Sequence, residues 1–594
     1  MGPRLNRLEL GLVSIVFAIG FGLRAAYPSR IAIEHFDEGV YASNLYTLDG
    51  RYPFQHLYAP PLLPFCLEWA AIFGGPHAVM WVNVLSGSLT LLVLWGMVRQ
   101  WWGPPAAIAA MVLLAFNEFH IAYSRAALTD AMLGLWMTAG VWAGWRAIQF
   151  GGPLSILAAG ALASLAWWTK YNGWLTLAIT GAGAAGWILF GNAQAKIESP
   201  ASEGRQPPVN PHQHPDVSSR AKTTAGSRRS LADAPKTNTV FGAARLFLGR
   251  WLLTAAIAFL LWSPWLWELQ QYGGYAAVAK NHAGYFTGVG QWWANAQQQL
   301  AAQWHYVGWL SHFAFMVSCL LPAAWLTWYV ARRKGSRPTM IAVMARRAPG
   351  LLSAWTIAAW TLGLCISIPL YTPYPRIGLP LVIAAAVLGG LFGKMATADL
   401  VPEDPGPGAT GVDVPDNQRR ELLWFISAFA VLIPMYVSWS QGESAAPQWE
   451  SRRGLDAIAS EVIGRIDRAK LTREIDGVRC VLYVLAEPGL FFHLGAAQRE
   501  SPIGHIAIPT ADYSMAAPGA NTSGLPAYIV VGPHAEASHP REANRLIAAG
   551  RLELVAEFDY RPSDLVLLDS RPVWKIPGKD NPVIERIRLL HVKP

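Results

Sequence analysis

The chain contains the run HAVMWVNVLSGSLTLLVLWGMV at residues 77–98, with no Asp, Glu, Lys or Arg in it. A helix needs about 20 apolar residues to cross the hydrocarbon of a bilayer, so this run is long enough to span a membrane. Ten more runs of this kind occur near residues 8–26, 104–122, 127–145, 153–169, 171–190, 246–267, 306–330, 350–370, 377–395 and 421–439. The sequence therefore predicts a polytopic α-helical membrane protein with about 11 transmembrane helices.

The overall composition agrees with a membrane protein. Of 594 residues, 53% are hydrophobic and only 14% are charged, which argues against a single water-soluble domain. The net charge is +9. In a membrane protein such an excess is explained by loop charges, so nucleic acid is not an expected partner. The four cysteines are far apart and form no pattern typical of a disulfide framework or a zinc site.

The distribution of basic residues predicts the orientation. With the N-terminus in the cytoplasm, the inside segments carry 22 Lys and Arg residues and the outside segments up to residue 440 carry 7. Because Lys and Arg concentrate in cytoplasmic loops, we expect a multi-pass protein of the cell (inner) membrane with a cytoplasmic N-terminus.

Composition also divides the chain into four parts. Residues 1–190 hold the first six predicted helices, with an outer loop at 27–76, and residues 244–440 hold the last five. Between them, residues 191–243 are rich in Pro, Ser and mixed charge, which is typical of a disordered cytoplasmic linker.

Residues 441–594 contain no run long enough to cross a bilayer. β-rich runs at 478–485, 528–531 and 565–568 alternate with helical patterns near 451–470 and 541–549. We therefore expect a C-terminal soluble α/β domain outside the cell membrane, with an accessory role.

The first outer loop carries two adjacent acids, Asp37 and Glu38. An ionised carboxylate held near a substrate serves either as a general base or as a cation ligand. The alternative is a solvated loop with ordinary surface acids.

Two further charged groups lie at predicted outer turns. Arg125 and Asp130 are five residues apart, so either Arg125 faces a phosphate and Asp130 orients it, or the two simply pair. Lys170 stands beside tryptophans, a pattern that also fits a lysine reaching from the interface to water.

Arg376 follows Tyr374-Pro375 in a turn too short to leave the membrane surface. Its guanidinium group is suited to hold a lipid-linked phosphate, or else it contacts lipid headgroups. The loop 268–305, which includes His282 and several aromatic residues, indicates an interfacial helix, a sugar-stacking surface or a membrane anchor.

In their order along residues 5–440, these motifs resemble the polyprenyl-phosphate-dependent membrane glycosyltransferases of the GT-C fold, in particular the protein O-mannosyltransferase and lipid A aminoarabinose transferase group (glycosyltransferase family 39-like). The matching segments are Asp37-Glu38 with Tyr41-Ala42, Pro60-Pro61-Leu62, Tyr123-Ser124-Arg125 with Asp130, Lys170 with Gly173, and Tyr374-Pro375-Arg376.

The resemblance implies an enzyme that transfers a sugar from a polyprenyl-phosphate carrier to an unidentified hydroxyl acceptor outside the membrane, with inversion. It implies Asp37 as general base, Glu38 as its orienting partner, and cations that bind the donor phosphate. The residues expected to bind that phosphate are Arg125, Lys170 and Arg376, and those expected to contact the substrate are Tyr41, Tyr58, Asp130, Tyr374 and His282.

No nucleotide is required, and we assign neither a certain cofactor nor a metal site, because members of the group differ in their use of a divalent metal. Three other readings stay open on the residues alone: a transporter or flippase for lipid-linked glycans, a polysaccharide ligase or polymerase, and a non-catalytic assembly protein.

Overall fold

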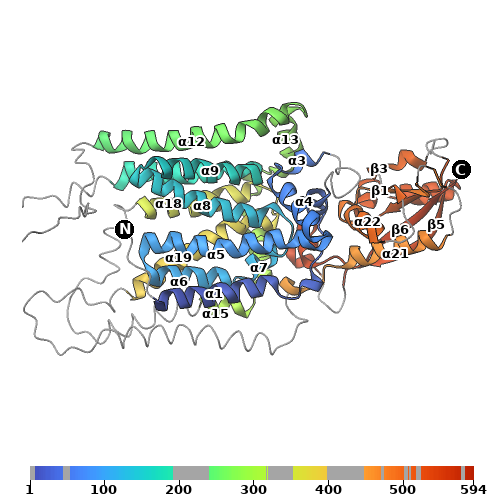
Figure 1. Cartoon of the computed structure of the whole chain (residues 1–594), viewed down its shortest axis with the longest axis horizontal. Coiled ribbons are helices and arrows are strands. Elements are labelled where there is room, and N and C mark those ends of the chain that lie inside the picture. The colour runs from blue at the N-terminus through green and yellow to red at the C-terminus, as the bar shows by residue number, and fades with distance from the viewer. Residues whose placement is uncertain are drawn as a thin grey trace, which may run out of the picture.

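The computed structural model describes residues 7–43, 54–191, 240–315, 318, 352–397, 447–469 and most of 474–593. Long helices run side by side, and a mixed β-sheet lies beyond one end of the bundle (Figure 1). The long bundle helices are α1 (Arg7–Ala25), α5 (Trp81–Trp102), α6 (Pro104–Ala115), α8 (Thr129–Phe150), α9 (Pro153–Thr169), α10 (Leu175–Gly186), α12 (Val240–Gln270), α18 (Leu352–Ser367) and α19 (Leu379–Thr397).

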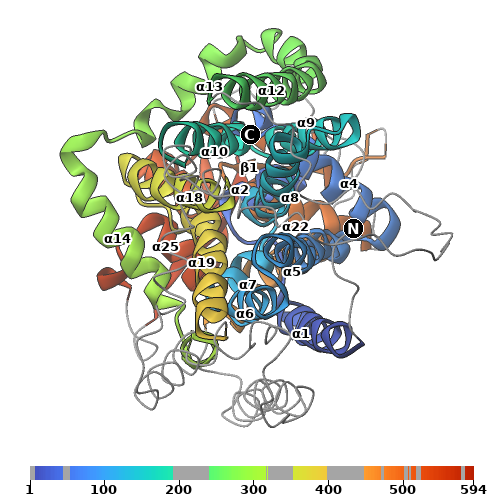
Figure 2. The same ribbon diagram turned by 90° about the vertical axis from the view of Figure 1, so that its left-hand side faces the viewer.

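Of the shorter helices, α3 (Gln55–Tyr58), α4 (Leu62–Gly74), α7 (Glu118–Ser124) and α13 (Gly274–His282) lie toward the sheet end of the bundle (Figure 1). The others are α2 (Phe36–Ala42), α14 (Trp292–His305) and α15 (Trp309–Phe315). Viewed along the bundle, α12, α13 and α14 lie on its rim (Figure 2).

The number of membrane spans differs from the expectation. Five helices in the described ranges are long and apolar enough to cross a membrane, or up to six if the bent pair of α6 and α7 counts as one. The predicted count of 11 is therefore not confirmed. The predicted span 421–439 and most of 306–330 lie outside the described residues.

The predicted span at 104–122 is not one continuous helix, because the chain bends by 64° between α6 and α7; the two helices are long and apolar enough for a span only when taken together. Arg24 stabilises the bend. Its guanidinium group is buried and donates to the carbonyls of Leu114 (3.0 Å) and Ala115 (3.1 Å), and the Leu114 carbonyl also accepts from the backbone N–H of Asn117 at 3.3 Å. The side chain of Asn117 then caps α7 by accepting from the backbone N–H of His120. Polar partners at the bend thus replace the lost helical bonds.

Helix boundaries follow local sequence. Gly103 has a φ of +93° where α5 ends, and Pro104 opens α6. Gly151 has a φ of +71° where α8 ends, and Pro153 opens α9. Glycine adopts positive φ without a steric penalty and proline suits the first helical turn, so these pairs separate consecutive helices by one or two residues.

The sheet belongs to a part that we call the C-terminal unit, meaning the described residues from Pro447 onward. Its strand order is β2-β1-β4-β6-β5, and β3 also pairs with β1. The pairs that β1 forms are parallel, whereas β6 is antiparallel to both neighbours. The strands are β1 (Cys480–Leu485), β2 (Ile506–Ala507), β3 (Thr510–Ala511), β4 (Ala527–Val531), β5 (Leu552–Tyr560) and β6 (Glu585–Val592), and the helices are α21 (Gly454–Arg468), α22 (Pro488–Glu500), α23 (Pro533–Ser538), α24 (Glu542–Ala548) and α25 (Asp564–Ser570).

The predicted small α/β region is present, with one element wrong. The run 565–568 lies in helix α25, which begins after Ser563. A short apolar run does not distinguish a strand from a turn of buried helix, and here Ser563 precedes it at the N-cap position. Strands β5 and β6 went unpredicted because charged residues interrupt their apolar residues and several of their side chains are exposed.

One hydrophobic core joins the C-terminal unit to the bundle. It continues from Leu63 and Phe119 at the end of the bundle to Leu482, Val530 and Leu589 in the sheet, and all five side chains are almost fully buried. The two parts therefore pack as one body at this junction. The predicted boundaries 1–190, 244–440 and 441–594 stay predictions, and the predicted linker 191–243 lies almost entirely outside the described residues.

Helix α2 lies at this junction, against the start of α22. A Cβ atom on Gly39 would lie 2.1 Å from the backbone N of Gly489 and 2.2 Å from the carbonyl carbon of Pro488. Only glycine permits that backbone approach. The contact fixes the position of α2, which carries Asp37, relative to the C-terminal unit.

Candidate functional site

The sequence-predicted residues Asp37 and Arg376 meet at the end of the bundle that faces the C-terminal unit. The Nη1 of Arg376 lies 2.6 Å from the Oδ2 of Asp37, and the two side chains are 14% and 15% exposed. Asp37 lies in the first turn of α2, and Arg376 lies in a 3-10 turn, Pro375–Gly378, that precedes α19. An acid and a cation more than 300 positions apart in the sequence thus form one partly exposed ion pair.

A second predicted ion pair lies at the same end of the bundle. The Nζ of Lys170 lies 2.7 Å from the Oδ1 of Asp130. Lys170 follows the last residue of α9 and Asp130 is in the first turn of α8, so a helix end and a helix start present the pair. The Oδ2 of Asp130 is buried and accepts no hydrogen bond from any described residue. The pairing partner of Asp130 is therefore Lys170 rather than Arg125.

Predicted aromatic residues surround the first pair. Tyr41 is buried, and the charges of Asp37, Arg376 and Asp130 all act on its hydroxyl. The Arg376 guanidinium carbon is 5.4 Å from the ring centroid of Tyr374, a cation–π contact. Burial, followed by the charge of Asp37, raises the pKa of Tyr58 to about 12, so that phenol stays neutral and able to donate.

His282 lies farther out, among aromatic rings. Its ring is 5.9 Å from that of Tyr285, which in turn lies 5.4 Å from the ring of Tyr374. The Nδ1 of His282 lies 2.9 Å from the carbonyl of Val278. His282 therefore connects with the site through an aromatic series rather than by direct contact with Arg376.

Glu38 has no open side. Its side chain is fully buried, one oxygen accepts from the backbone N–H of Ala127 at 2.6 Å, and the other accepts from the backbone N–H groups of Glu34 and His35 at 2.9 Å. Arg452 of the C-terminal unit forms an ion pair with that second oxygen. Glu38 thus caps α2 and orients the helix that bears Asp37.

Arg125 is likewise occupied by the protein. It is 3% exposed, and its Nη1 donates to the carbonyl of Arg24 at 2.9 Å and to that of Ala26. These carbonyls lie at the end of α1 and immediately beyond it. The structure therefore places Arg125 as a brace between α1 and α8 and does not bring it into the ion pairs of Asp37 or Asp130.

Two residues that sequence reasoning missed complete the cluster. Asp569, on α25 of the C-terminal unit, has its Oδ2 2.5 Å from the Nε2 of His35 and 3.6 Å from the Nε of Arg376. Burial favours a higher pKa for Asp569, but Arg376 and His35 together outweigh it, so the pKa lies below its usual range. His35 lies two positions before Asp37 in the sequence, whereas Asp569 shows no local motif that distinguishes it from a surface acid.

A second missed group joins the C-terminal unit to the first loop. Glu34 is buried and accepts from the Tyr560 hydroxyl at 3.1 Å and from the Ser563 backbone N–H at 3.0 Å. Its other oxygen lies 3.4 Å from the Nε of Arg452 and accepts from the Ser563 hydroxyl. Arg452 and Glu34 therefore hold the C-terminal unit on the loop that carries Asp37.

Helix α14 supports the Arg376 turn with its polar face. The amide of Asn295 donates to the carbonyls of Pro369 and Tyr371, each at 3.0 Å, and that of Gln299 donates to the carbonyl of Tyr374 at 2.9 Å. The opposite face is apolar and exposed, at Trp293, Leu300 and Trp304. Such an amphipathic helix is suited to an interface, and the three readings of this loop, an interfacial helix, a sugar-stacking surface and a membrane anchor, stay predictions.

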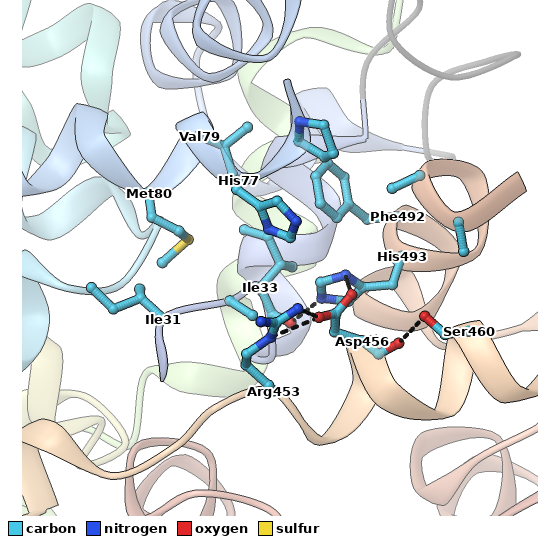
Figure 3. A pocket seen from close by; sticks show the side chains of 14 residues that line it. Ile31, Ile33, His77, Val79, Met80, Arg453, Asp456, Ser460, Phe492 and His493 are labelled. Carbon is cyan, nitrogen blue, oxygen red and sulfur yellow. Dashed lines mark hydrogen bonds and ion pairs between the residues drawn. The ribbon is translucent and has the colours of Figure 1, made fainter. Parts of the chain in front are cut away.

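A pocket of about 90 Å³ lies elsewhere at the junction, between the segment 31–33, residues 76–80 and the helices α21 and α22 (Figure 3). Three of its polar side chains form contacts within the protein: Asp456 pairs with Arg453 and with His493, and His493 also lies 2.7 Å from the carbonyl of Ile33. None of the predicted site residues lines it. The Asp37–Arg376 pair is therefore the better candidate for chemistry.

Among the residues whose placement is described, no group of three or more His, Cys, Asp or Glu side chains has an arrangement that would hold a metal ion. The acids of the cluster have basic partners instead: Asp37 and Asp569 both adjoin Arg376, and Asp130 pairs with Lys170.

Residues 75–198 match the family model for dolichyl-phosphate-mannose-protein mannosyltransferase, a range that includes Asp130 and Lys170. A search among curated proteins gives no match.

Three solved structures are similar. ArnT from Cupriavidus metallidurans bound to undecaprenyl phosphate is 14% identical, with 99% of this chain and 98% of that chain covered and a TM-score of 0.48. Its apo state is 14% identical, with 98% and 97% covered and a TM-score of 0.49. The oligosaccharyltransferase from Archaeoglobus fulgidus in the apo form is 10% identical, with 88% and 69% covered and a TM-score of 0.42. The family-model match confirms, over residues 75–198, the resemblance to polyprenyl-phosphate-dependent GT-C glycosyltransferases that the sequence motifs indicate.

Proposed function

We propose that this protein is an inverting glycosyltransferase that moves a sugar from a polyprenyl-phosphate carrier to a hydroxyl acceptor on the extracytoplasmic side of the membrane. The observation that carries the proposal is the contact between Asp37 and Arg376, 2.6 Å apart at the end of a helical bundle whose apolar helices can cross a membrane. The family that residues 75–198 match uses a lipid-phosphate sugar donor by its description, which supports the same reaction class.

In the proposed reaction Asp37 removes the proton of the acceptor hydroxyl as that oxygen attacks the anomeric carbon. The bond from the anomeric carbon to the phosphate oxygen breaks on the opposite face, and polyprenyl phosphate leaves with the bonding electrons. A positioned general base typically contributes about 10² to 10⁴ in rate. Glu38 contributes by holding the α2 helix, because its own oxygens have protein partners.

Negative charge grows on the phosphate as the glycosidic bond breaks, so cations aimed at its oxygens stabilise the transition state. We assign this role to Arg376 and Lys170. In the absence of donor each of them is paired with a carboxylate, Asp37 and Asp130 respectively. A bound phosphate would replace Asp37 as the partner of Arg376 and so release the carboxylate for its role as base.

The remaining predicted residues form the surroundings of the transferred sugar. We propose that Tyr41, Tyr58 and Tyr374 contact the substrate, that Asp130 orients Lys170, and that His282 lies at the outer rim. Arg125 braces the turn and is not assigned to the phosphate, because backbone carbonyls occupy its guanidinium group.

The test is an assay of polyprenyl-phosphate release. Purified protein in lipid is incubated with a panel of labelled polyprenyl-phosphate sugars, and wild type is compared with Asp37→Asn and Arg376→Ala. We expect release by the wild type with at least one donor and a large loss in both variants. Equal release from all three proteins would refute the proposed site.

The proposed orientation has its own test. Single cysteines placed at an exposed position of the C-terminal unit, such as Glu553, and near Asp37 should react with an impermeant thiol reagent from the extracytoplasmic side. Labelling of these two positions from opposite sides of the membrane would contradict the proposal.

A further inference from the structure

The proposed reaction so far uses residues of the membrane bundle and the first loop, whereas Asp569 reaches the same cluster from the C-terminal unit. We propose that Asp569 is a positioning residue of the transfer site, which acts through His35 to hold the helix that carries Asp37. This inference rests on the proposed function.

His35 bridges Asp569 and Asp37, and its hydrogen bonds show which ring nitrogen carries the proton. Its Nδ1 accepts from the backbone N–H of Asp37 at 3.1 Å, so that nitrogen carries no proton. The proton of the imidazole therefore sits on Nε2 and is donated to the Oδ2 of Asp569 at 2.5 Å. A continuous series of hydrogen bonds thus runs from α25 of the C-terminal unit to the amide of the proposed base.

The other carboxylates that join the C-terminal unit to the loop differ from Asp569 in one respect. Both oxygens of Glu34 and both oxygens of Glu38 have hydrogen-bond partners, as expected of groups that serve docking alone. In contrast, the Oδ1 of Asp569 is buried and lacks a partner among the residues that the structure describes. A carboxylate that served only to dock the C-terminal unit would be more stable with both oxygens hydrogen-bonded. In a substrate site, the unpaired oxygen can accept a hydrogen bond from a bound molecule.

The position of Asp569 relative to Arg376 agrees with this role. Its Oδ2 lies 3.6 Å from the Nε of Arg376, while Asp37 takes the Nη1 of the same guanidinium group. Asp569 thus adjoins both members of the proposed catalytic pair, Arg376 directly and Asp37 through His35. When a phosphate displaces Asp37 from Arg376, the bridge through His35 still holds the backbone of Asp37 in place.

The chain offers a variant that separates this bridge from simple helix capping. Asparagine is a preferred N-cap residue, so His35→Asn keeps an acceptor for the α2 amides. Its shorter side chain does not reach Asp569. The matched control is Asp564→Asn, which removes a carboxylate from the same helix, α25. Asp564 pairs with His305 on α14 and is not a partner of His35 or Arg376.

The experiment measures steady-state release of polyprenyl phosphate by wild type, His35→Asn, Asp569→Ala and the double variant, each checked for an unchanged thermal transition. We expect each single variant to lower kcat about tenfold and to change the KM for the donor less than threefold. The double variant should fall no further than the single ones, because both remove the same bridge. Asp569→Glu, which keeps the charge, should recover part of the loss, and Asp564→Asn should stay within twofold of wild type.

Other outcomes would overturn the inference. A wild-type kcat in His35→Asn would show that capping alone matters. A loss of kcat in the double variant equal to the product of the two single losses would show that the two residues act separately. An equal loss in Asp564→Asn would assign the effect to docking of the C-terminal unit. A wild-type protein that releases no polyprenyl phosphate from any donor would remove the transfer function itself, whereas an active wild type with active variants would remove only the role of Asp569.

Discussion

At the scale of single residues, the charged side chains at this end of the bundle fall into two groups. Some pair with another charged side chain, and others are enclosed by backbone donors or acceptors. Asp37, Arg376, Lys170 and Asp130 could be identified from sequence because charges at a bilayer surface are few and each one is costly. The amino-acid sequence could not show that backbone donors and acceptors enclose Glu38 and Arg125, since those partners come from distant segments. Asp569 could not be found at all, because no local motif distinguishes it from the other acids of the C-terminal unit.

The different positions of Arg125 and Lys170 lead to a prediction for the two charges. Arg125→Gln should lower the thermal stability, because two backbone carbonyls lose a buried donor, a loss of about 1–3 kcal/mol. It should leave the donor KM within about twofold. Lys170→Gln should instead raise the donor KM with little effect on stability. Thermal unfolding and donor titration of both variants check this, and a raised KM in Arg125→Gln would return that residue to the phosphate site.

At the scale of elements, most of the apolar runs in the described ranges lie in helices, but only five or six of those helices are long and apolar enough to cross a membrane, so the predicted 11 spans stay unconfirmed. The bend between α6 and α7 could not be predicted, because it depends on Arg24, which lies 90 positions away from Leu114. Residues 565–568, predicted as a strand but found in α25, show the same limit, because a short apolar run fits both a strand and a helix.

Gly39 gives an element-scale prediction for the contact of α2 with α22. An alanine Cβ there would clash with the backbone of Pro488 and Gly489, which cannot move aside by a change of rotamer as a side chain can. We expect Gly39→Ala to cost about 1–3 kcal/mol of stability and to lower transfer at least tenfold. The matched control is Gly22→Ala in α1, where nothing lies within 4 Å of an added Cβ. Unchanged transfer in Gly39→Ala would show that the position of α2 does not matter to the site.

Helix α14 leads to a second element-scale prediction. Asn295→Ala removes the donor to the carbonyls of Pro369 and Tyr371, which should loosen the turn that carries Arg376 and raise the donor KM about threefold to tenfold. Gln297→Ala, on an exposed part of the same helix, should change neither KM nor kcat. If both variants behave alike, the polar face of α14 has no part in holding Arg376.

At the scale of the whole molecule, composition predicted a membrane part and a C-terminal α/β part, but not that they share one core. Contacts between the two parts join residues separated by more than 400 positions, such as Glu34 and Arg452. No local pattern records such pairing. The sequence therefore indicated an accessory C-terminal domain, whereas the structure places its residues against the candidate site.

Glu450 at this junction predicts how stability depends on pH. Burial and then the charges of Asp564 and Glu34 raise the pKa of Glu450 to about 8. A raised acid pKa means that the folded chain keeps a proton which the unfolded chain has released, so stability falls as pH rises from about 5 to about 8. Glu450→Gln keeps the oxygen that accepts from the Asp564 amide and removes this titration.

We therefore expect the melting temperature of Glu450→Gln to exceed that of wild type at pH 8 and to approach it at pH 5. The control is Glu461→Gln on α21, where the side chain is 50% exposed and the pH profile should match wild type. A wild-type melting temperature that rises steadily from pH 5 to pH 8, with no difference from Glu450→Gln, would contradict the prediction.

The most direct test of the Asp37–Arg376 site measures donor binding and single-turnover transfer on the same samples of wild type, Asp37→Asn and Arg376→Ala. The account predicts that Asp37→Asn binds a polyprenyl-phosphate sugar at least as tightly as wild type, because Arg376 loses a competing carboxylate, yet transfers about 10² to 10⁴ times more slowly. Arg376→Ala should lose at least tenfold in donor affinity. Wild-type transfer rates in both variants would contradict the account.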